Sequence, residues 1–151
     1  MSVRILLFCA CLLLWRGASA IDEVFQTEEG ALRGYDVVAY HEEGRPVPGT
    51  AEFTHVWNGA TWRFSNADHR DRFAADPERF APQYGGYCAY GTSRGYKVST
   101  QPDAFAVIDG KLYLNYSKGV QQTWSKDPAN FIRIADTEWL KLEHEAYTRG
   151  D

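Results

Sequence analysis

Tyr84-Gly85-Gly86-Tyr87-Cys88-Ala89-Tyr90-Gly91 is the stretch around which this sequence of 151 residues is organised. It holds three tyrosines, three glycines and a cysteine, and it separates two segments with similar patterns. Glycine lets a backbone turn sharply or approach another segment closely. A cysteine among phenol rings is either a small buried hydrophobe or a soft metal ligand, and the sequence leaves both interpretations open.

The two flanking segments predict the same order of secondary structure. Each has a hairpin, a capped helix and a further helix that begins at an Asp-Pro pair, where proline suits the first helical position. The first segment predicts strands at 52–57 and 61–64 around Asn58-Gly59, then helices at 66–75 and 76–80. The second predicts a turn at Asp109-Gly110, a strand at 111–115 and helices at 117–126 and 127–142.

A shift of 51 residues aligns the two segments without a gap. The shift pairs Gly59 with Gly110, Trp62 with Tyr113, Phe73 with Trp124, Asp76-Pro77 with Asp127-Pro128, and Phe80 with Phe131. We therefore expect an α+β domain over residues 34–142, built from two repeated hairpin–helix–helix units that share a small antiparallel sheet. Upstream, residues 21–33 predict at most a short helix, and the loose alternation of 35–41 predicts a strand. Residues 143–151 form a polar tail.

Residues 1–20 have the features of a cleaved signal peptide. Arg4 precedes an apolar run over residues 5–14, and Ala18-Ser19-Ala20 fits a small-x-small cleavage site. The run is too short to span a bilayer. Cleavage after Ala20 would place the protein in the periplasm or outside the cell, and lipidation at Cys11 is the alternative.

Cleavage would also change the charge and the cysteine content. The full chain has a net charge of −4, and the loss of two arginines and no acids makes it −6. This acidity argues against nucleic acid or an anionic membrane as a partner. Cys88 would remain as the only cysteine, and in an oxidising compartment it must be buried, metal-bound, redox-active or paired with another chain.

Two histidines join Cys88 as candidate ligands. His69 lies one helical turn before Phe73 and so shares its inward face. It needs a partner there, either a backbone carbonyl or a metal ion shared with Cys88. His55 alternates with Phe53 and Trp57, and it is either another imidazole ligand or a hydrogen-bonded core histidine.

Other titratable residues predict simpler roles. His41 and His144 are expected to be solvated, and Asp36 to cap backbone amides or to hydrogen-bond a tyrosine. The sequence has no HExxH, CxxC or phosphate-loop motif and no nucleophile elbow. Cys88 as a catalytic nucleophile would need a lowered thiol pKa.

Several of these stretches together resemble the YHS domain. They are Tyr35-Asp36-Val37-Val38-Ala39-Tyr40, Trp62-Arg63-Phe64-Ser65, His69, Phe73, Asp76-Pro77 and Phe80. The stretch 84–90, followed by residues 109–116, is similar to a secreted bacterial branch of that family. The resemblance covers about residues 34–140 and implies a small α+β fold and metal binding, often of copper. Cysteine-bearing members have ligand cysteines where this chain has Ala39, Ser65 and His69, so the resemblance implies a different site here.

The function that we expect is metal capture, without catalysis. A thiolate from Cys88 with imidazoles from His69 and His55 would suit copper, and zinc or iron less well. The alternative is a module that binds a small molecule or a protein through an aromatic pocket around Cys88. Tyr84, Tyr87 and Tyr90, with Trp62 and Trp124, would line that pocket.

Overall fold

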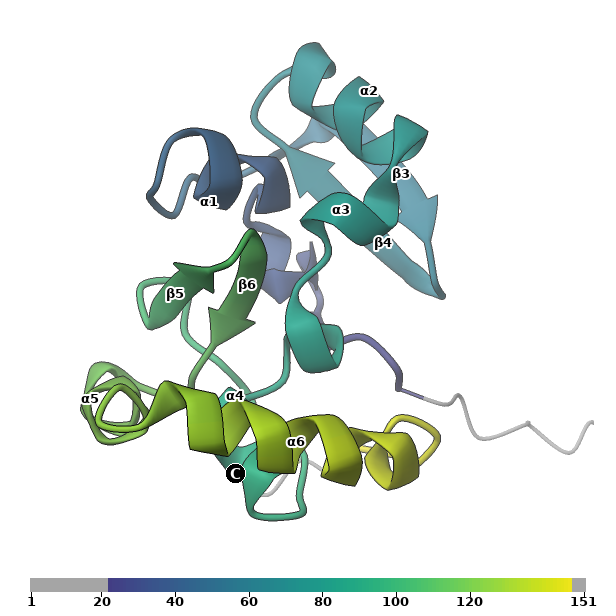
Figure 1. Ribbon diagram of the computed structural model, residues 1–151. Coiled ribbons are helices and arrows are strands. Elements are labelled where there is room, and N and C mark those ends of the chain that lie inside the picture. Colours follow the sequence, from purple (N-terminus) through teal and green to yellow (C-terminus); the bar gives the residue numbers. More distant parts are fainter. Residues whose placement is uncertain (1–21, 148–151) are drawn as a thin grey trace, which may run out of the picture.

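The computed structural model describes residues 22–147, so the expected signal peptide lies outside the described residues. Figure 1 shows a mixed helix and strand architecture, as the sequence predicts. The strands are β1 (Gln26–Thr27), β2 (Gly30–Ala31), β3 (Thr50–Trp57), β4 (Ala60–Phe64), β5 (Phe105–Ile108) and β6 (Lys111–Leu114). The helices are α1 (Val37–Glu42), α2 (Ala67–Ala75), α3 (Pro77–Phe80), α4 (Ala89–Ser93), α5 (Lys118–Trp124) and α6 (Pro128–Leu142). Two 3₁₀ turns lie at Leu32–Gly34 and Gln83–Gly86.

In the described part of the chain, the strands form three separate antiparallel hairpins, β1–β2, β3–β4 and β5–β6. The long hairpin turns where the sequence predicts, since Asn58 and Gly59 have φ angles of 49° and 72°. Positive φ at both central residues is typical of a type I′ turn, whose backbone twist matches the twist of the two paired strands. No helix among residues 22–147 is long and apolar enough to cross a bilayer.

Side-chain caps fix the starts of the predicted helices. Asn66 accepts a hydrogen bond from the His69 N–H at 2.8 Å, and Ser117 accepts one from the Val120 N–H at 3.2 Å. Such caps satisfy backbone donors that have no partner inside the helix. The helices predicted after Asn66 and Ser117 are therefore confirmed as α2 and α5.

The strand expected at residues 35–41 is wrong, because Val37–Glu42 is helix α1. Val37, Val38 and Ala39 are all fully buried, so one-sided alternation does not apply to them. A short apolar run fits a buried helix as well as a strand, and the Asp36 cap decides for the helix. The lead-in at 21–33 also differs from the expectation, since it contains the short hairpin β1–β2.

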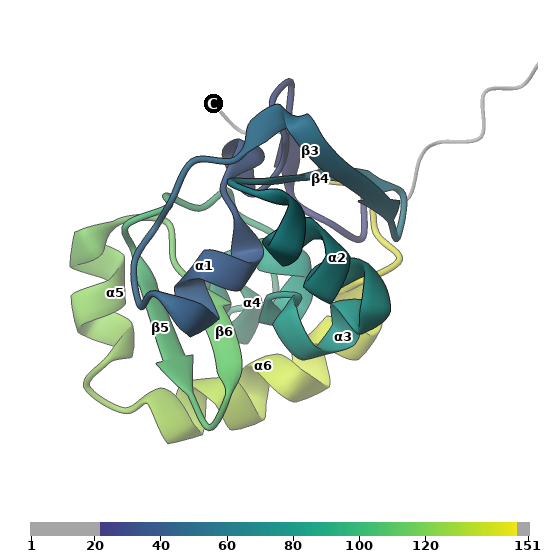
Figure 2. The same ribbon diagram turned by 90° about the horizontal axis from the view of Figure 1, so that it is seen from above.

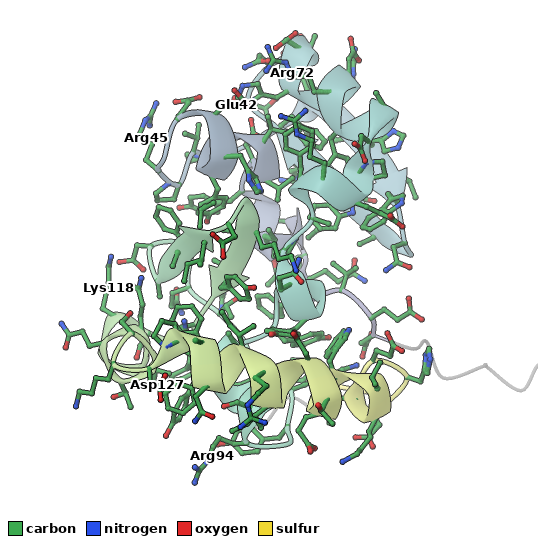
Figure 3. The ribbon with its side chains drawn as sticks, viewed as in Figure 1. Glu42, Arg45, Arg72, Arg94, Lys118 and Asp127 are labelled. Carbon is green, nitrogen blue, oxygen red and sulfur yellow. The ribbon has the colours of Figure 1, made fainter. Side chains whose placement is uncertain are left out.

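The molecule has two tiers with a ring-rich core in each (Figures 1 and 2). The upper tier contains α1, α2, α3 and the β3–β4 hairpin, and the lower tier contains α4, α5 and α6. Strand β6 contributes to both cores, because alternate side chains point to opposite faces. Leu112 and Leu114 belong to the upper core, whereas Tyr113 belongs to the lower core with Trp124. Charged side chains such as Arg45, Arg94 and Lys118 point outward (Figure 3).

Candidate functional site

Asp36 is the most heavily hydrogen-bonded side chain of the upper tier, and it is fully buried. Its Oδ1 accepts the N–H groups of Val38 at 3.0 Å and Ala39 at 3.3 Å, which caps α1. Its Oδ2 accepts both the N–H of Ser65 at 2.8 Å and the Ser65 hydroxyl at 2.7 Å. The expected capping role of Asp36 is thus confirmed, but no tyrosine bonds it among the described residues.

The fifth donor to Asp36 is the imidazole of His69. Its Nδ1 lies 2.7 Å from Oδ2 of Asp36, so Nδ1 carries the hydrogen and donates to the carboxylate. The His69 side chain is 10% exposed, and its Nε2 has no hydrogen-bond partner among residues 22–147. The contact with Asp36 fixes the orientation of the ring at Nδ1 and leaves Nε2 as the nitrogen that is available to another partner.

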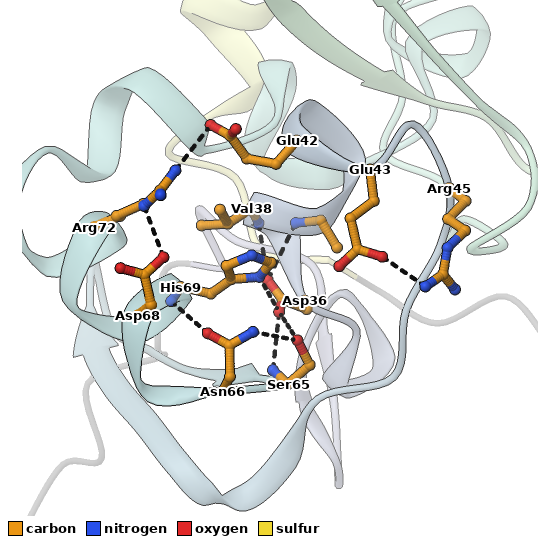
Figure 4. Close-up of polar contacts among 11 residues, drawn as sticks. Asp36, Val38, Glu42, Glu43, Arg45, Ser65, Asn66, Asp68, His69 and Arg72 are labelled. Carbon is orange, nitrogen blue, oxygen red and sulfur yellow. Dashed lines mark hydrogen bonds and ion pairs between the residues drawn. The ribbon is translucent and has the colours of Figure 1, made fainter.

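Three segments converge on this pair, as Figure 4 shows. Asp36 precedes α1, Ser65 follows β4, and His69 projects from the first turn of α2. Beside the pair, Arg72 of α2 forms an ion pair with Glu42 of α1 at 3.4 Å, which links the two helices. Arg72 also pairs with Asp68 within α2 at 2.9 Å. The imidazole is thus held at the seam between two helices rather than on a mobile loop.

Cys88 lies in the lower tier as the cap of α4, with 1% of its surface exposed. Its Sγ accepts the N–H groups of Gly91 at 3.4 Å and Tyr116 at 3.3 Å. Its thiol can donate to Oδ1 of Asn115, 3.6 Å away. Burial raises the pKa of the Cys88 thiol, and the backbone N–H donors offset part of that increase. The geometry is that of a neutral thiol with its hydrogen bonds made, rather than of an activated nucleophile.

The structure does not bring the three predicted ligands together. His69 lies on α2 in the upper tier, and Cys88 lies at α4 in the lower tier (Figure 1). His55 is half-buried on β3, where its ring packs edge-on against Phe73 at 6.1 Å. Within residues 22–147, no cluster of three His, Cys, Asp or Glu side chains could hold a metal ion.

The three tyrosines of the central stretch are packed within the lower tier. Tyr84 contacts the ring of Tyr113 at 6.1 Å and donates from its hydroxyl to Asp136 at 2.8 Å. Tyr87 donates to the carbonyl of Asp22 at 3.0 Å. Tyr90 packs against the ring of Phe131, on α6. These ring contacts pack the tyrosines against Tyr113 and α6 and stabilise the lower tier.

No motif in the sequence indicates Asn115 or Lys97 as a functional residue, although both have distinctive environments in the structure. Asn115 is fully buried, its Oδ1 accepts the Tyr90 N–H at 3.2 Å, and its Nδ2 has no partner in the described structure. Its place as the last residue of the strand predicted over 111–115 gave only a weak signal. The contacts of Lys97 with residues at both ends of the described chain depend on the tertiary fold, so no local pattern could reveal them.

Comparisons of the chain with protein-family models, with curated proteins and with solved structures found no match.

Proposed function

We propose that this protein is an exported YHS-type domain that captures or hands over a metal ion, copper in the first place, through Nε2 of His69. The observation that carries this proposal is the Asp36–His69 pair. Metal-ligating histidines commonly donate their other ring N–H to a carboxylate, which fixes the ring and increases its basicity. The 2.7 Å contact between Nδ1 and Asp36 has that form, and Nε2 is left without a protein partner in the described chain.

The choice of copper as the metal ion depends on the imidazole ligand of His69. Imidazole suits copper, zinc, iron and nickel, and a given nitrogen site generally binds Cu²⁺ most strongly among the divalent first-row ions. His69 supplies one ligand, so the remaining ligands would come from water or from the molecule that delivers or receives the ion. This arrangement suits brief handling of copper better than its long-term storage.

We also propose that the two halves are copies of one unit, larger than the hairpin–helix–helix segment. Equivalent contacts support this. The Asp36 N–H donates to the carbonyl of Val47 at 2.8 Å, and the Cys88 N–H donates to that of Val98 at 3.0 Å. The Ser65 N–H bonds the Asp36 side chain as the Tyr116 N–H bonds that of Cys88. These contacts make Asp36 the counterpart of Cys88, which needs a gap of one residue because a shift of 51 pairs Asp36 with Tyr87. The shift of 51 pairs His69 with Val120 in the second half.

The assignments to the YHS family and to the periplasm or the exterior are supported by sequence patterns alone. The family assignment depends on the motifs at 35–40, 62–65 and 84–90, and the location depends on residues 1–20.

Competition against a chelator tests the copper proposal. The purified protein is titrated with Cu²⁺ in a buffered chelator, alongside His69→Gln and Cys88→Ser. Glutamine can still donate to Asp36 but lacks the ring nitrogen, so we expect His69→Gln to weaken binding at least tenfold. Cys88→Ser should bind as the wild type does. Equal affinity in the wild type and His69→Gln would reject the proposal.

A further inference from the structure

A second candidate site lies in the lower tier, away from His69. A pocket of about 360 Å³ opens between the β5–β6 hairpin and the first turns of α6. Its lining is formed by Ile108, Asp109, Lys111, Tyr113, Pro128, Ala129 and Ile132. Apolar walls with a few polar groups are typical of small-molecule sites.

The hydroxyl of Tyr113 is the polar group that points to a ligand. Tyr113 is 3% exposed, yet its hydroxyl has no hydrogen-bond partner within the described chain. The sealed polar atoms without a partner there are Nδ2 of Asn115 and Nε1 of Trp124. The Tyr113 oxygen is not one of them, so it is open to water beside the pocket that its ring lines. A bound ligand would replace that water as the partner of the hydroxyl.

The corresponding corner of the upper tier shows what such a site can hold. Trp62 precedes Tyr113 by 51 residues, and its Nε1 donates to the carbonyl of Trp57 at 3.0 Å. The pocket at that corner is smaller, about 110 Å³, and its wall includes Trp139 of α6 and the neighbouring Glu143. Trp139 therefore borders this corner, while its ring packs against Tyr84 and Tyr87. In the lower tier, no residue of the described chain takes that place.

The charges around Tyr113 favour a cation. Asp109 lines the pocket, and both Asp109 and Asp136 act on the Tyr113 hydroxyl, whose pKa is raised first by burial and then by these two carboxylates. Asp136 also accepts the Tyr84 hydroxyl. Lys111 is the opposing charge, and like Asp109 and Asp136 it is exposed. Two carboxylates against one ammonium leave the site negative.

We propose that this pocket binds a small aromatic amine, with its ring between Ile108 and Ile132 and its ammonium group directed to the Tyr113 hydroxyl and the carboxylates. The ring would occupy the corner that corresponds to the one bordered by Trp139 beside Trp57 and Trp62. The site is independent of His69, so it is a binding activity additional to the copper proposal.

Chemical-shift mapping of the ¹⁵N-labelled protein tests this site, with tryptamine as the probe. We expect saturable shifts centred on residues 108–113 and 128–132. Tyr113→Phe removes only the hydroxyl and should weaken binding by about 3- to 10-fold, the range for one lost hydrogen bond. Ala129→Trp fills the pocket from an exposed helix position and should abolish binding. The matched control is Gln122→Trp, which adds the same ring on the exposed surface of α5 and should leave binding unchanged.

Indole-3-acetate carries the same ring with a carboxylate and should bind at least tenfold more weakly than tryptamine. Equal binding of the two probes would overturn the amine assignment. An absence of tryptamine shifts in the wild type, or unchanged binding by Ala129→Trp, would overturn the site itself.

Discussion

At the scale of single residues, Asp36 and Cys88 have the same structural role, because each caps the start of a helix, Asp36 with a carboxylate and Cys88 with a thiol. Each also accepts a backbone N–H from a residue farther along the chain, Ser65 at a separation of 29 residues or Tyr116 at a separation of 28. The carboxylate has a second oxygen and so can also accept His69, whereas the thiol donates to Asn115. The capping role of Asp36 could be predicted from its position before an apolar run. Its bond to His69 could not, because the two residues are 33 apart in sequence.

The first prediction concerns Cys88 as a structural thiol. Cys88→Ser keeps a donor and an acceptor, whereas Cys88→Ala leaves the Gly91 and Tyr116 N–H groups without an acceptor. We expect Cys88→Ala to lower the free energy of unfolding by about 1–3 kcal/mol and Cys88→Ser to lower it less. Urea denaturation measures both. Equal losses in the two variants would contradict a hydrogen-bonding role for the sulfur.

The second prediction concerns His41, which the sequence wrongly placed in solvent. Its ring packs against Phe80 at 5.6 Å, and its Nε2 lies 3.1 Å from the Phe80 carbonyl oxygen. Burial lowers the pKa of His41 below its usual value of 6.5, and the bond to Phe80 offsets only part of this. The unfolded chain then binds the proton more readily than the folded chain, so stability is lost as pH falls below about 6.5.

Replacement of His41 by glutamine isolates this effect, because glutamine can still donate to Phe80 but does not titrate. Between pH 7.5 and 5.5 we expect the wild type to lose more free energy of unfolding than His41→Gln. His144→Gln is the matched control, since the His144 side chain is 64% exposed. The account of His41 fails if the wild type and His41→Gln have parallel pH profiles.

At the scale of elements, local rules explain what could be predicted. The turns at Asn58-Gly59 and Asp109-Gly110 and the Asp-Pro helix starts depend on a few adjacent residues, and the structure has each of them. Helix α1 could not be predicted in the same way. Its first four residues, Val37–Tyr40, are all buried by packing against distant segments, which removes the periodicity that distinguishes helix from strand.

The third prediction tests the central glycine stretch. Gly85 has φ of +62°, and a Cβ atom there would overlap the backbone carbonyl oxygen of Glu23. Gly110 has φ of +74° with nothing within 4 Å of its Cβ position, so Gly110→Ala reports backbone strain alone. We expect Gly110→Ala to cost about 1–2 kcal/mol of stability and Gly85→Ala clearly more. Similar melting temperatures for the two variants would show that the close approach of Gly85 to Glu23 does not contribute to the stability of the fold.

At the scale of the whole molecule, Lys97 joins the two ends of the described chain. Its Nζ donates to the carbonyl of Asp22 at 2.8 Å and to that of Glu143 at 3.3 Å. The same ammonium group lies over the rings of Tyr87 and Trp139, at 5.1 and 5.3 Å from their centroids. These contacts hold the polar segment after α6 against the start of the domain.

The fourth prediction follows from this arrangement. Lys97→Met keeps the length of the side chain but leaves the carbonyl oxygens without their donor. We expect hydrogen exchange to increase several-fold at residues 143–147, with little change in the β3–β4 hairpin. Lys111→Met, at an exposed position, should leave exchange at both places unchanged. If hydrogen exchange at residues 143–147 is the same in Lys97→Met as in the wild type, contacts other than those of Lys97 hold this segment.

Only part of the candidate site could be predicted from the sequence. The inward position of His69 could be predicted, because it shares a helical face with Phe73. The assembly of His69, His55 and Cys88 depends on how the two tiers pack, and hydrophobic periodicity does not encode that arrangement. The tiers meet along β6. Cys88 bridges to Leu114 at the end of β6, whereas His69 lies on α2 in the upper tier.

The central claim is that the His69 imidazole binds copper, and pulsed electron paramagnetic resonance tests it most directly. The remote nitrogen of a copper-bound imidazole gives a characteristic modulation in spectra of the Cu²⁺ complex. We predict this modulation in the wild type, in His55→Gln and in His144→Gln, and its loss in His69→Gln. An undiminished imidazole signal from His69→Gln would contradict the claim.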